Sequence, residues 1–252
     1  MGSELVVDGG DFRAALAVFR ERERIFSSFE PGTELDRVNS SQTSLVQLSA
    51  EFARAVRTAL RAAVETDGIL APTARWRELR LEGRVLRRPP GVRLELNGVV
   101  KPLAVDDALR RSGARLVSAG GNLAVARPTI IGLPGTGTIA LGSGGLATSA
   151  RPARRPAHGW SGPSVLRASS RWDEVTVAAD SCLHADLAAQ AAFVLSADGP
   201  DWLDERGLPG RFRAAGRTIH NRTWKTNLTE FLGAVQAPLR HAVGVSTKGR
   251  SS

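Results

Sequence analysis

The chain of 252 residues has no tyrosine, only 5% aromatic residues and a single cysteine, Cys182. One cysteine excludes a disulfide within the chain, and nothing indicates an oxidising compartment. The sequence also lacks a basic and apolar leader segment, and it has no apolar run long enough to cross a bilayer. We therefore expect a cytoplasmic protein without a membrane span, whose core is built mainly from Leu, Val and Ala.

Lysine is scarce as well, although the net charge is +9. Nearly all of the positive charge is arginine, and the lysines are Lys101, Lys225 and Lys248. A basic chain is compatible with an anionic partner such as a nucleotide or a nucleic acid. The arginines are scattered rather than gathered in one stripe, and alanine is abundant, so overall composition explains the charge better. We expect no nucleic-acid partner.

Apolar periodicity indicates helices interleaved with short strands. Helices are predicted from Phe12, with Asp11 as N-cap, and over residues 44–64, 184–195 and 201–206. Strands are predicted over residues 93–96, 115–118, 138–141 and 174–178. The spacing is not that of regular βαβ units, which favours an α+β fold. A chain of this size and 42% hydrophobic content favours one domain.

The segment that runs from Leu94 to Asp106 is the most informative one, and it reads LELNGVVKPLAVD. Its leucines alternate with polar residues, as in a half-buried strand. An Asn-Gly turn dipeptide follows, and an apolar-periodic run opens at Ala104. Lys101 lies between the predicted turn and the predicted helix, where a lysine and exposed backbone N–H groups can meet an anion.

This segment resembles, without a gap, the Leu-Asp-Leu-Gly-Gly-Ile-Ala-Lys-Gly-Tyr-Ala-Val-Asp signature of the FAD:protein FMN transferases, the ApbE family. Further segments resemble the family's motifs in the family's order: Met1–Ser3, Phe26–Asn39, Thr66–Thr73, Ser118–Leu123, Ala147–Ser149, Val175–Val177 and Ala185–Asp186. The resemblance implies a single ApbE-like α+β domain over residues 1–225, with mixed or antiparallel sheets flanked by helices and a nucleotide-binding cleft. Residues 226–252 are expected to form a C-terminal tail, partly disordered.

The resemblance also implies a reaction and its participants. The family moves the FMN half of FAD, the substrate, onto a Thr or Ser hydroxyl of a partner flavoprotein and releases AMP. Mg²⁺ and a lysine neutralise charge on the phosphate oxygens in such a step. A further group must accept the proton of the attacking hydroxyl.

Roles follow residue by residue from the same resemblance. Lys101 is expected to contact phosphate and His158 to accept the proton. Asp186 and Gln190 are expected to bind the metal, since positions i and i+4 share one helix face. The residues expected to bind the flavin nucleotide are Lys101, Asp106, Gly120, Gly121, Asn122, Thr148 and Ser149. On the residues alone, Asp106 and Asp186 are also explained as first-turn helix acids that favour the helix dipole.

The chain departs from the family's pattern at positions where the family does chemistry. The departures are Asn97 and Pro102 in place of glycines, Leu103 in place of an aromatic, Ser161 in place of Asp, and Gln190 in place of Thr. Two other functions therefore stay open beside FMN transfer. One is a noncatalytic FAD-binding protein that has lost transfer, and the other is an FAD pyrophosphatase in which water replaces the acceptor hydroxyl.

Overall fold

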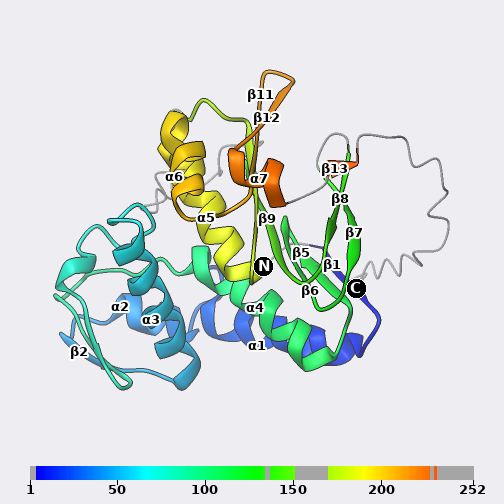
Figure 1. Cartoon of the computed structure of the whole chain (residues 1–252). Coiled ribbons are helices and arrows are strands. Elements are labelled where there is room, and N and C mark those ends of the chain that lie inside the picture. The colour runs from blue at the N-terminus through cyan, green and yellow to red at the C-terminus, as the bar shows by residue number, and fades with distance from the viewer. Residues whose placement is uncertain (1–3, 134–136, 151–169, 228–229, 232–252) are drawn as a thin grey trace.

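The computed structural model describes residues 4–133, 137–150, 170–227 and 230–231 (Figure 1). Its main element is a seven-stranded antiparallel sheet with the strand order β1-β5-β6-β9-β10-β11-β12. The bounds of these strands are Leu5–Asp8, Leu116–Ala119, Asn122–Val125, Gly144–Ala150, Glu174–Ala179, Gly210–Ala214 and Arg217–His220. The α+β fold class is confirmed.

Two three-stranded antiparallel sheets accompany the main sheet. One has the order β13-β8-β7, with bounds Glu230–Phe231, Thr138–Leu141 and Thr129–Gly132. The other has the order β2-β4-β3, with bounds Leu45–Gln47, Val85–Arg87 and Arg80–Glu82. Strand β13 belongs to the expected tail, so the described part of that tail contributes a strand to a sheet.

Helices cover the main sheet and the smaller β2-β4-β3 sheet (Figure 1). The α-helices are α1 Phe12–Phe26, α2 Glu34–Ser40, α3 Ala50–Glu65, α4 Asn97–Ser112, α5 Cys182–Leu195, α6 Gly199–Glu205 and α7 Arg222–Asn227. Short 3-10 helices span Trp76–Glu78 and Ser196–Asp198. None of the described helices has the length and apolarity to cross a membrane.

Packing places α4 and α5 at the centre of the molecule. Helix α4 packs its Ala104, Val105 and Ala108 with α1 and with strands β5 and β6. Helix α5 packs alanines and Phe193 against β10 and β11. The α2 and α3 helices form a separate apolar cluster with the β2-β4-β3 sheet and the first turn of α4. The start of α4 is therefore held between the main sheet and this smaller lobe.

Most of the predicted elements are confirmed to within one or two residues. Asp11 is the N-cap of α1, and its carboxylate accepts the N–H groups of Arg13 and Ala14 at 2.8 and 3.2 Å. The predicted strands at 115–118, 138–141 and 174–178 correspond to β5, β8 and β10. The predicted helices at 184–195 and 201–206 correspond to α5 and α6.

The predicted helix over residues 44–64 was wrong at its start. Residues Leu45–Gln47 form β2, which pairs with β4, and α3 begins only at Ala50. Ser49 is the N-cap, and its hydroxyl accepts the Phe52 N–H at 3.2 Å. The strand partner lies about forty residues further along the chain, so helical periodicity in the sequence could not reveal it.

The predicted strand over residues 93–96 was also wrong. These residues form no sheet ladder, although Leu94 and Leu96 are buried as expected. The Asn97-Gly98 dipeptide is not a separate turn, because α4 already begins at Asn97 and continues through Pro102. Asn39 instead bonds to the backbone of Leu94: its side chain accepts the Leu94 N–H at 2.7 Å and donates to the Leu94 carbonyl at 3.0 Å.

Candidate active site

A cavity of about 280 Å³ that is lined mainly by polar residues, the polar cavity, lies between the N-terminal halves of α4 and α5, beside the β5–β6 turn and the end of β9. It is lined by Glu95, Asn97, Gly98, Lys101, Gly120, Asn122, Thr148, Ser149, Ala150, Asp186 and Gln190. The lining includes most of the residues expected from the sequence, although they come from four separate segments of the chain. The lining residues that the residue-by-residue expectation missed are Glu95, Asn97, Gly98 and Ala150.

Asp186 is the buried acid of this cavity, with 8% of its surface exposed. Burial raises the pKa of its carboxyl to about 6, while the charge of Lys101 and hydrogen bonds from Gln190 and Asn122 favour the ionised form. The Gln190 amide nitrogen donates to Asp186 Oδ2 at 2.7 Å. The ionised Asp186 carboxylate can therefore accept hydrogen bonds from N–H groups or bind a positively charged group.

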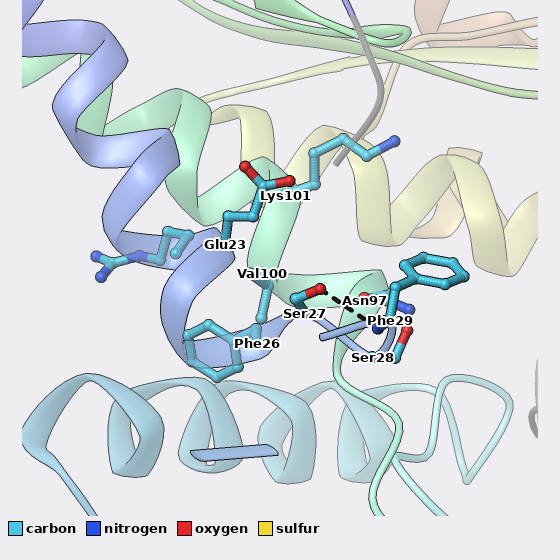
Figure 2. A pocket seen from close by; sticks show the side chains of 9 residues that line it. Glu23, Phe26, Ser27, Ser28, Phe29, Asn97, Val100 and Lys101 are labelled. Atoms are coloured by element: carbon cyan, nitrogen blue, oxygen red, sulfur yellow. Dashed lines mark hydrogen bonds between the residues drawn. The ribbon is translucent and has the colours of Figure 1, made fainter. Parts of the chain in front are cut away.

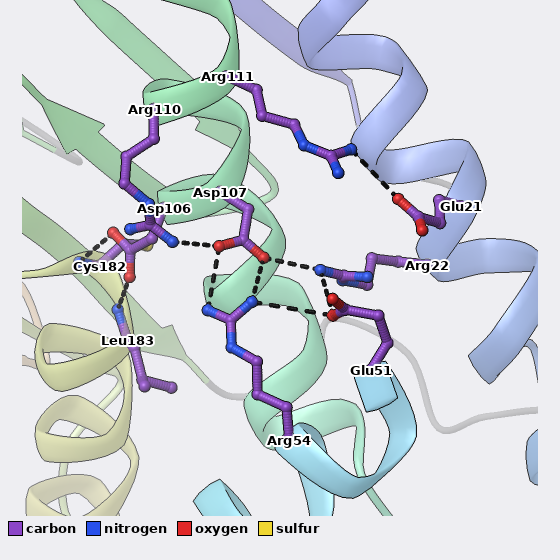
Figure 3. A network of polar contacts seen from close by, with 10 residues as sticks. All are labelled: Glu21, Arg22, Glu51, Arg54, Asp106, Asp107, Arg110, Arg111, Cys182 and Leu183. Atoms are coloured by element: carbon purple, nitrogen blue, oxygen red, sulfur yellow. Dashed lines mark hydrogen bonds and ion pairs between the residues drawn. The ribbon is translucent and has the colours of Figure 1, made fainter. Parts of the chain in front are cut away.

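Asp106 does not line the cavity but lies behind it. Its two carboxylate oxygens accept the backbone N–H groups of Cys182 and Leu183 at 2.9 and 3.0 Å (Figure 3). Since these N–H groups belong to the first turn of α5, Asp106 caps α5 from α4. Burial raises the pKa of Asp106, and these two hydrogen bonds oppose the shift. Asp106 therefore holds the first turn of α5, which precedes Asp186, and its contact with the flavin nucleotide stays a prediction.

The β5–β6 turn and β9 form the opposite wall. Gly120 and Gly121 both have positive φ angles, 56° and 88°, which glycine adopts without strain. The Gly121 carbonyl accepts the Thr148 N–H at 3.0 Å, so Gly121 supports the wall although it does not line the cavity. The Thr148 hydroxyl pairs with that of fully buried Thr176 at 2.9 Å. This contact fixes the Thr148 side chain.

A second, wider cavity of about 610 Å³ adjoins the first at the C-terminal end of α1 (Figure 2). It is lined by Arg22, Glu23, Phe26, Ser27, Ser28, Phe29, Asn97, Val100 and Lys101. The two cavities share Asn97 and Lys101. Phe29 is 93% exposed beside the opening. Residues 26–29 of this wall belong to the segment Phe26–Asn39 that resembles a family motif, although the resemblance assigned them no role.

The predicted proton acceptor His158 lies outside the described residues, and so does Ser161. Within the described ranges, no group of three or more His, Cys, Asp and Glu side chains could hold a metal ion. A metal at this site would therefore depend on Asp186 and neutral oxygen donors, with Glu95 as the other acid that lines the cavity.

The donors around Asp186 fit a hard divalent cation such as Mg²⁺. They are the Asp186 carboxylate, the Gln190 amide and the Gly98 carbonyl, all of which offer oxygen. The Gly98 carbonyl is available because Pro102, four residues later in α4, has no N–H to donate to it. The Gln190 amide would have to present its oxygen, and not its nitrogen, to such a cation.

Solved structures of low sequence identity share this fold. A flavinyl transferase ApbE from Pseudomonas stutzeri is 17% identical, with a TM-score of 0.73 over 89% of this chain and 97% of that one. An ApbE protein from Thermotoga maritima is 20% identical, with a TM-score of 0.74 over 89% and 96%. A flavin transferase ApbE from Vibrio cholerae, as its H257G mutant, is 19% identical, with a TM-score of 0.70 over 89% and 94%.

The sequence comparison leads to the same group of proteins. No curated protein matches the chain significantly. The model of the ApbE family matches residues 1–75 and 72–212, which is most of the chain and includes every residue that lines the two cavities. The protein belongs to the ApbE family.

Proposed function

We propose that this protein transfers the FMN half of FAD to a Thr or Ser hydroxyl of a partner flavoprotein, with release of AMP and a requirement for Mg²⁺. The observation that carries the proposal is the pair of adjoining cavities that share Lys101. One is polar and contains the buried Asp186, and the other is wide and partly aromatic. The family and the flavin transferases of the same fold support it.

The two cavities suit the two chemically different parts of a flavin nucleotide. The wide cavity offers Phe26, Phe29 and Val100 to a planar apolar ring. Its volume of about 610 Å³ lies in the range of small-molecule sites. The polar cavity offers Lys101 to a phosphate, beside Gly120 and the hydroxyls of Thr148 and Ser149. Lys101 lies where ring and phosphate would meet.

The transfer step replaces the phosphoanhydride bond of the FAD pyrophosphate by a phosphoester bond to the acceptor. The acceptor oxygen bonds to the FMN-side phosphorus of the pyrophosphate, the bond from that phosphorus to the bridging oxygen breaks, and AMP leaves with the electron pair. Lys101 neutralises negative charge on the phosphate oxygens. We propose His158 as the acceptor of the hydroxyl proton. A cation held by Asp186, Gln190 and the Gly98 carbonyl would supply further charge neutralisation on the phosphates.

The experiment is an incubation of the full chain with FAD, Mg²⁺ and an acceptor domain that carries a Thr or Ser flavinylation motif. The intact mass of the acceptor should increase by one FMN unit, and the increase should be lost with Asp186→Ala. Asp201→Ala is the matched control, because Asp201 is an exposed acid in the first turn of α6, which contributes no residue to either cavity.

The same incubation separates the other functions. Release of FMN and AMP without an acceptor, at an unchanged acceptor mass, would show an FAD pyrophosphatase. Tight FAD binding with neither product would show a protein that has lost transfer. Either result contradicts the proposal, provided that the acceptor is flavinylated by another ApbE protein in parallel.

A further inference from the structure

The side-chain amide of Gln190 lies between two oxygen atoms. Its nitrogen donates to Asp186 Oδ2 at 2.7 Å and to the backbone carbonyl of Gly98 at 3.3 Å. Both neighbours are acceptors, so the nitrogen and not the oxygen must face them, and an NH₂ group has two hydrogens to give. The amide therefore bridges the acid of α5 and the first turn of α4.

Two features of α4 make room for this bridge. Pro102 cannot donate to the Gly98 carbonyl, which leaves that oxygen free for a partner outside the helix. Gly98 also has no side chain: a Cβ at this position would lie 3.3 Å from Gln190 Oε1, closer than an ordinary contact. The amide thus fits against the backbone of Gly98 on one side and Asp186 on the other.

The two oxygens that the amide bridges are the same two that a hard cation would use as ligands, in the cation site of the proposed function. The amide nitrogen lies between these two oxygens, 2.7 Å from one and 3.3 Å from the other, where a cation bound to both would lie, so the two compete for the same position. We propose that the Gln190 amide competes with the divalent cation for Asp186 and the Gly98 carbonyl, and that Gln190 thereby sets a low cation affinity. Binding of the cation requires that the amide turn away or present its oxygen.

The test compares cation binding by the full-length chain and by Gln190→Thr. Threonine removes both N–H donors and leaves one oxygen on the same face of α5. Mn²⁺ serves as the probe, and the free ion is counted by its electron paramagnetic resonance signal. We expect Gln190→Thr to bind Mn²⁺ about tenfold more tightly, the equivalent of one charge-assisted hydrogen bond that no longer has to be broken. Gln47→Thr, at an exposed position of β2, is the matched control and should bind as the unchanged chain does.

Pro102→Ala provides a second and opposite test. Alanine restores the N–H that bonds to the Gly98 carbonyl within α4, so this oxygen becomes a poorer ligand and Mn²⁺ affinity should fall severalfold. A third readout is the melting temperature in EDTA. It should be lower for Gln190→Thr than for the unchanged chain, because Asp186 then keeps its burial but loses a donor, and Mn²⁺ should raise it more in the variant.

Equal or weaker Mn²⁺ binding by Gln190→Thr overturns the proposal, and so does the absence of Mn²⁺ binding by both proteins. If circular dichroism shows that Gln190→Thr does not fold, Pro102→Ala decides, and unchanged affinity in that variant overturns the proposal. Since these measurements use neither FAD nor an acceptor, their failure is distinguishable from a failure of the transfer reaction itself.

Discussion

The buried Asp107 anchors three arginines that join three helices, and its replacement by Asn should destabilise the fold strongly. The Asp107 carboxylate accepts Arg22 at 2.7 Å and Arg54 at 2.7 and 3.0 Å, and it also pairs with Arg110 (Figure 3). These arginines come from α1, α3 and α4. The cluster therefore fixes the smaller lobe and α1 to the helix that carries Lys101.

The size of the effect follows from burial. The side chains of Arg22 and Asp107 are only 7% and 10% exposed, and removal of one member of a buried ion pair costs about 3 to 5 kcal/mol. Glu51 remains 2.7 Å from Arg22 as a second acceptor, which favours the lower end. Arg110 is 63% exposed and adds little. We expect Asp107→Asn to lower the free energy of unfolding by about 3 kcal/mol.

The assay is urea unfolding followed by circular dichroism, with Asp8→Asn as the matched control. Asp8 pairs with Arg115, but both side chains are nearly half exposed, so its loss should cost at most about 1 kcal/mol. If the two variants lose the same stability, or if Asp107→Asn loses less than about 1 kcal/mol, burial is not the cause and the reasoning fails.

The arginines around Asp107 also determine how stability depends on pH. Despite burial, hydrogen bonds from Arg54 and Arg22 hold the pKa of the Asp107 carboxyl below its usual value. Because the pKa is lowered in the folded state, the ionised Asp107 carboxylate contributes its full stabilisation above the unfolded-state pKa of about 3.9. This stabilisation is lost as the pH falls through the folded-state pKa. The difference in free energy of unfolding between the unchanged chain and Asp107→Asn should therefore be constant between about pH 5 and about pH 7, because this range lies about one unit or more above the unfolded-state pKa. The difference should shrink as the pH falls below the unfolded-state pKa.

Three further predictions concern α5 and its contacts. Asp106→Ala leaves two N–H groups of α5 without their acceptor, so the free energy of unfolding measured in urea should fall by about 2 kcal/mol. A loss of FAD affinity without a loss of stability would contradict the capping role. Gly145→Ala places a Cβ 2.2 Å from the Cys182 nitrogen and should lower the free energy of unfolding by about 3 kcal/mol or more. Gly132→Ala is the control, because a Cβ at Gly132 has open space around it. Equal losses of stability in the two variants would refute the packing argument. Burial raises the pKa of the Cys182 thiol well above its usual value, so a disulfide reagent at pH 8 should label it only in urea; rapid labelling of the folded chain would contradict this.

The family, the fold class and most elements were predictable from the sequence, because they depend on local patterns. Asp11 before an apolar-periodic run is a helix start wherever it occurs, and the structure confirms it. The motif around Lys101 and the order of the remaining motifs identified the family. The same motifs named Lys101, Gly120, Thr148 and Asp186, which the structure brings to one cavity.

Other features depend on contacts between distant segments, and the sequence could not show them. The segment 93–96, expected as a strand, forms no ladder; Asn39, more than fifty residues earlier, bonds to the Leu94 backbone, and the Pro72 carbonyl accepts the Glu95 N–H. Asp106 matches a family motif, yet its carboxylate is directed at α5 and not at the cavity. Both sets of hydrogen bonds join segments that are far apart in the sequence, so they depend on how the chain folds.

Gln190 shows the division between the two levels most clearly. The sequence by itself determined that Gln190 stands one helical turn after Asp186, because helical spacing is a local property. Only the tertiary structure decided that the amide also meets the Gly98 carbonyl, because that contact requires α4 and α5 to pack together and Pro102 to leave the carbonyl free. The spacing of Asp186 and Gln190 is a local property of the sequence, whereas the contact of Gln190 with the Gly98 carbonyl is a result of helix packing.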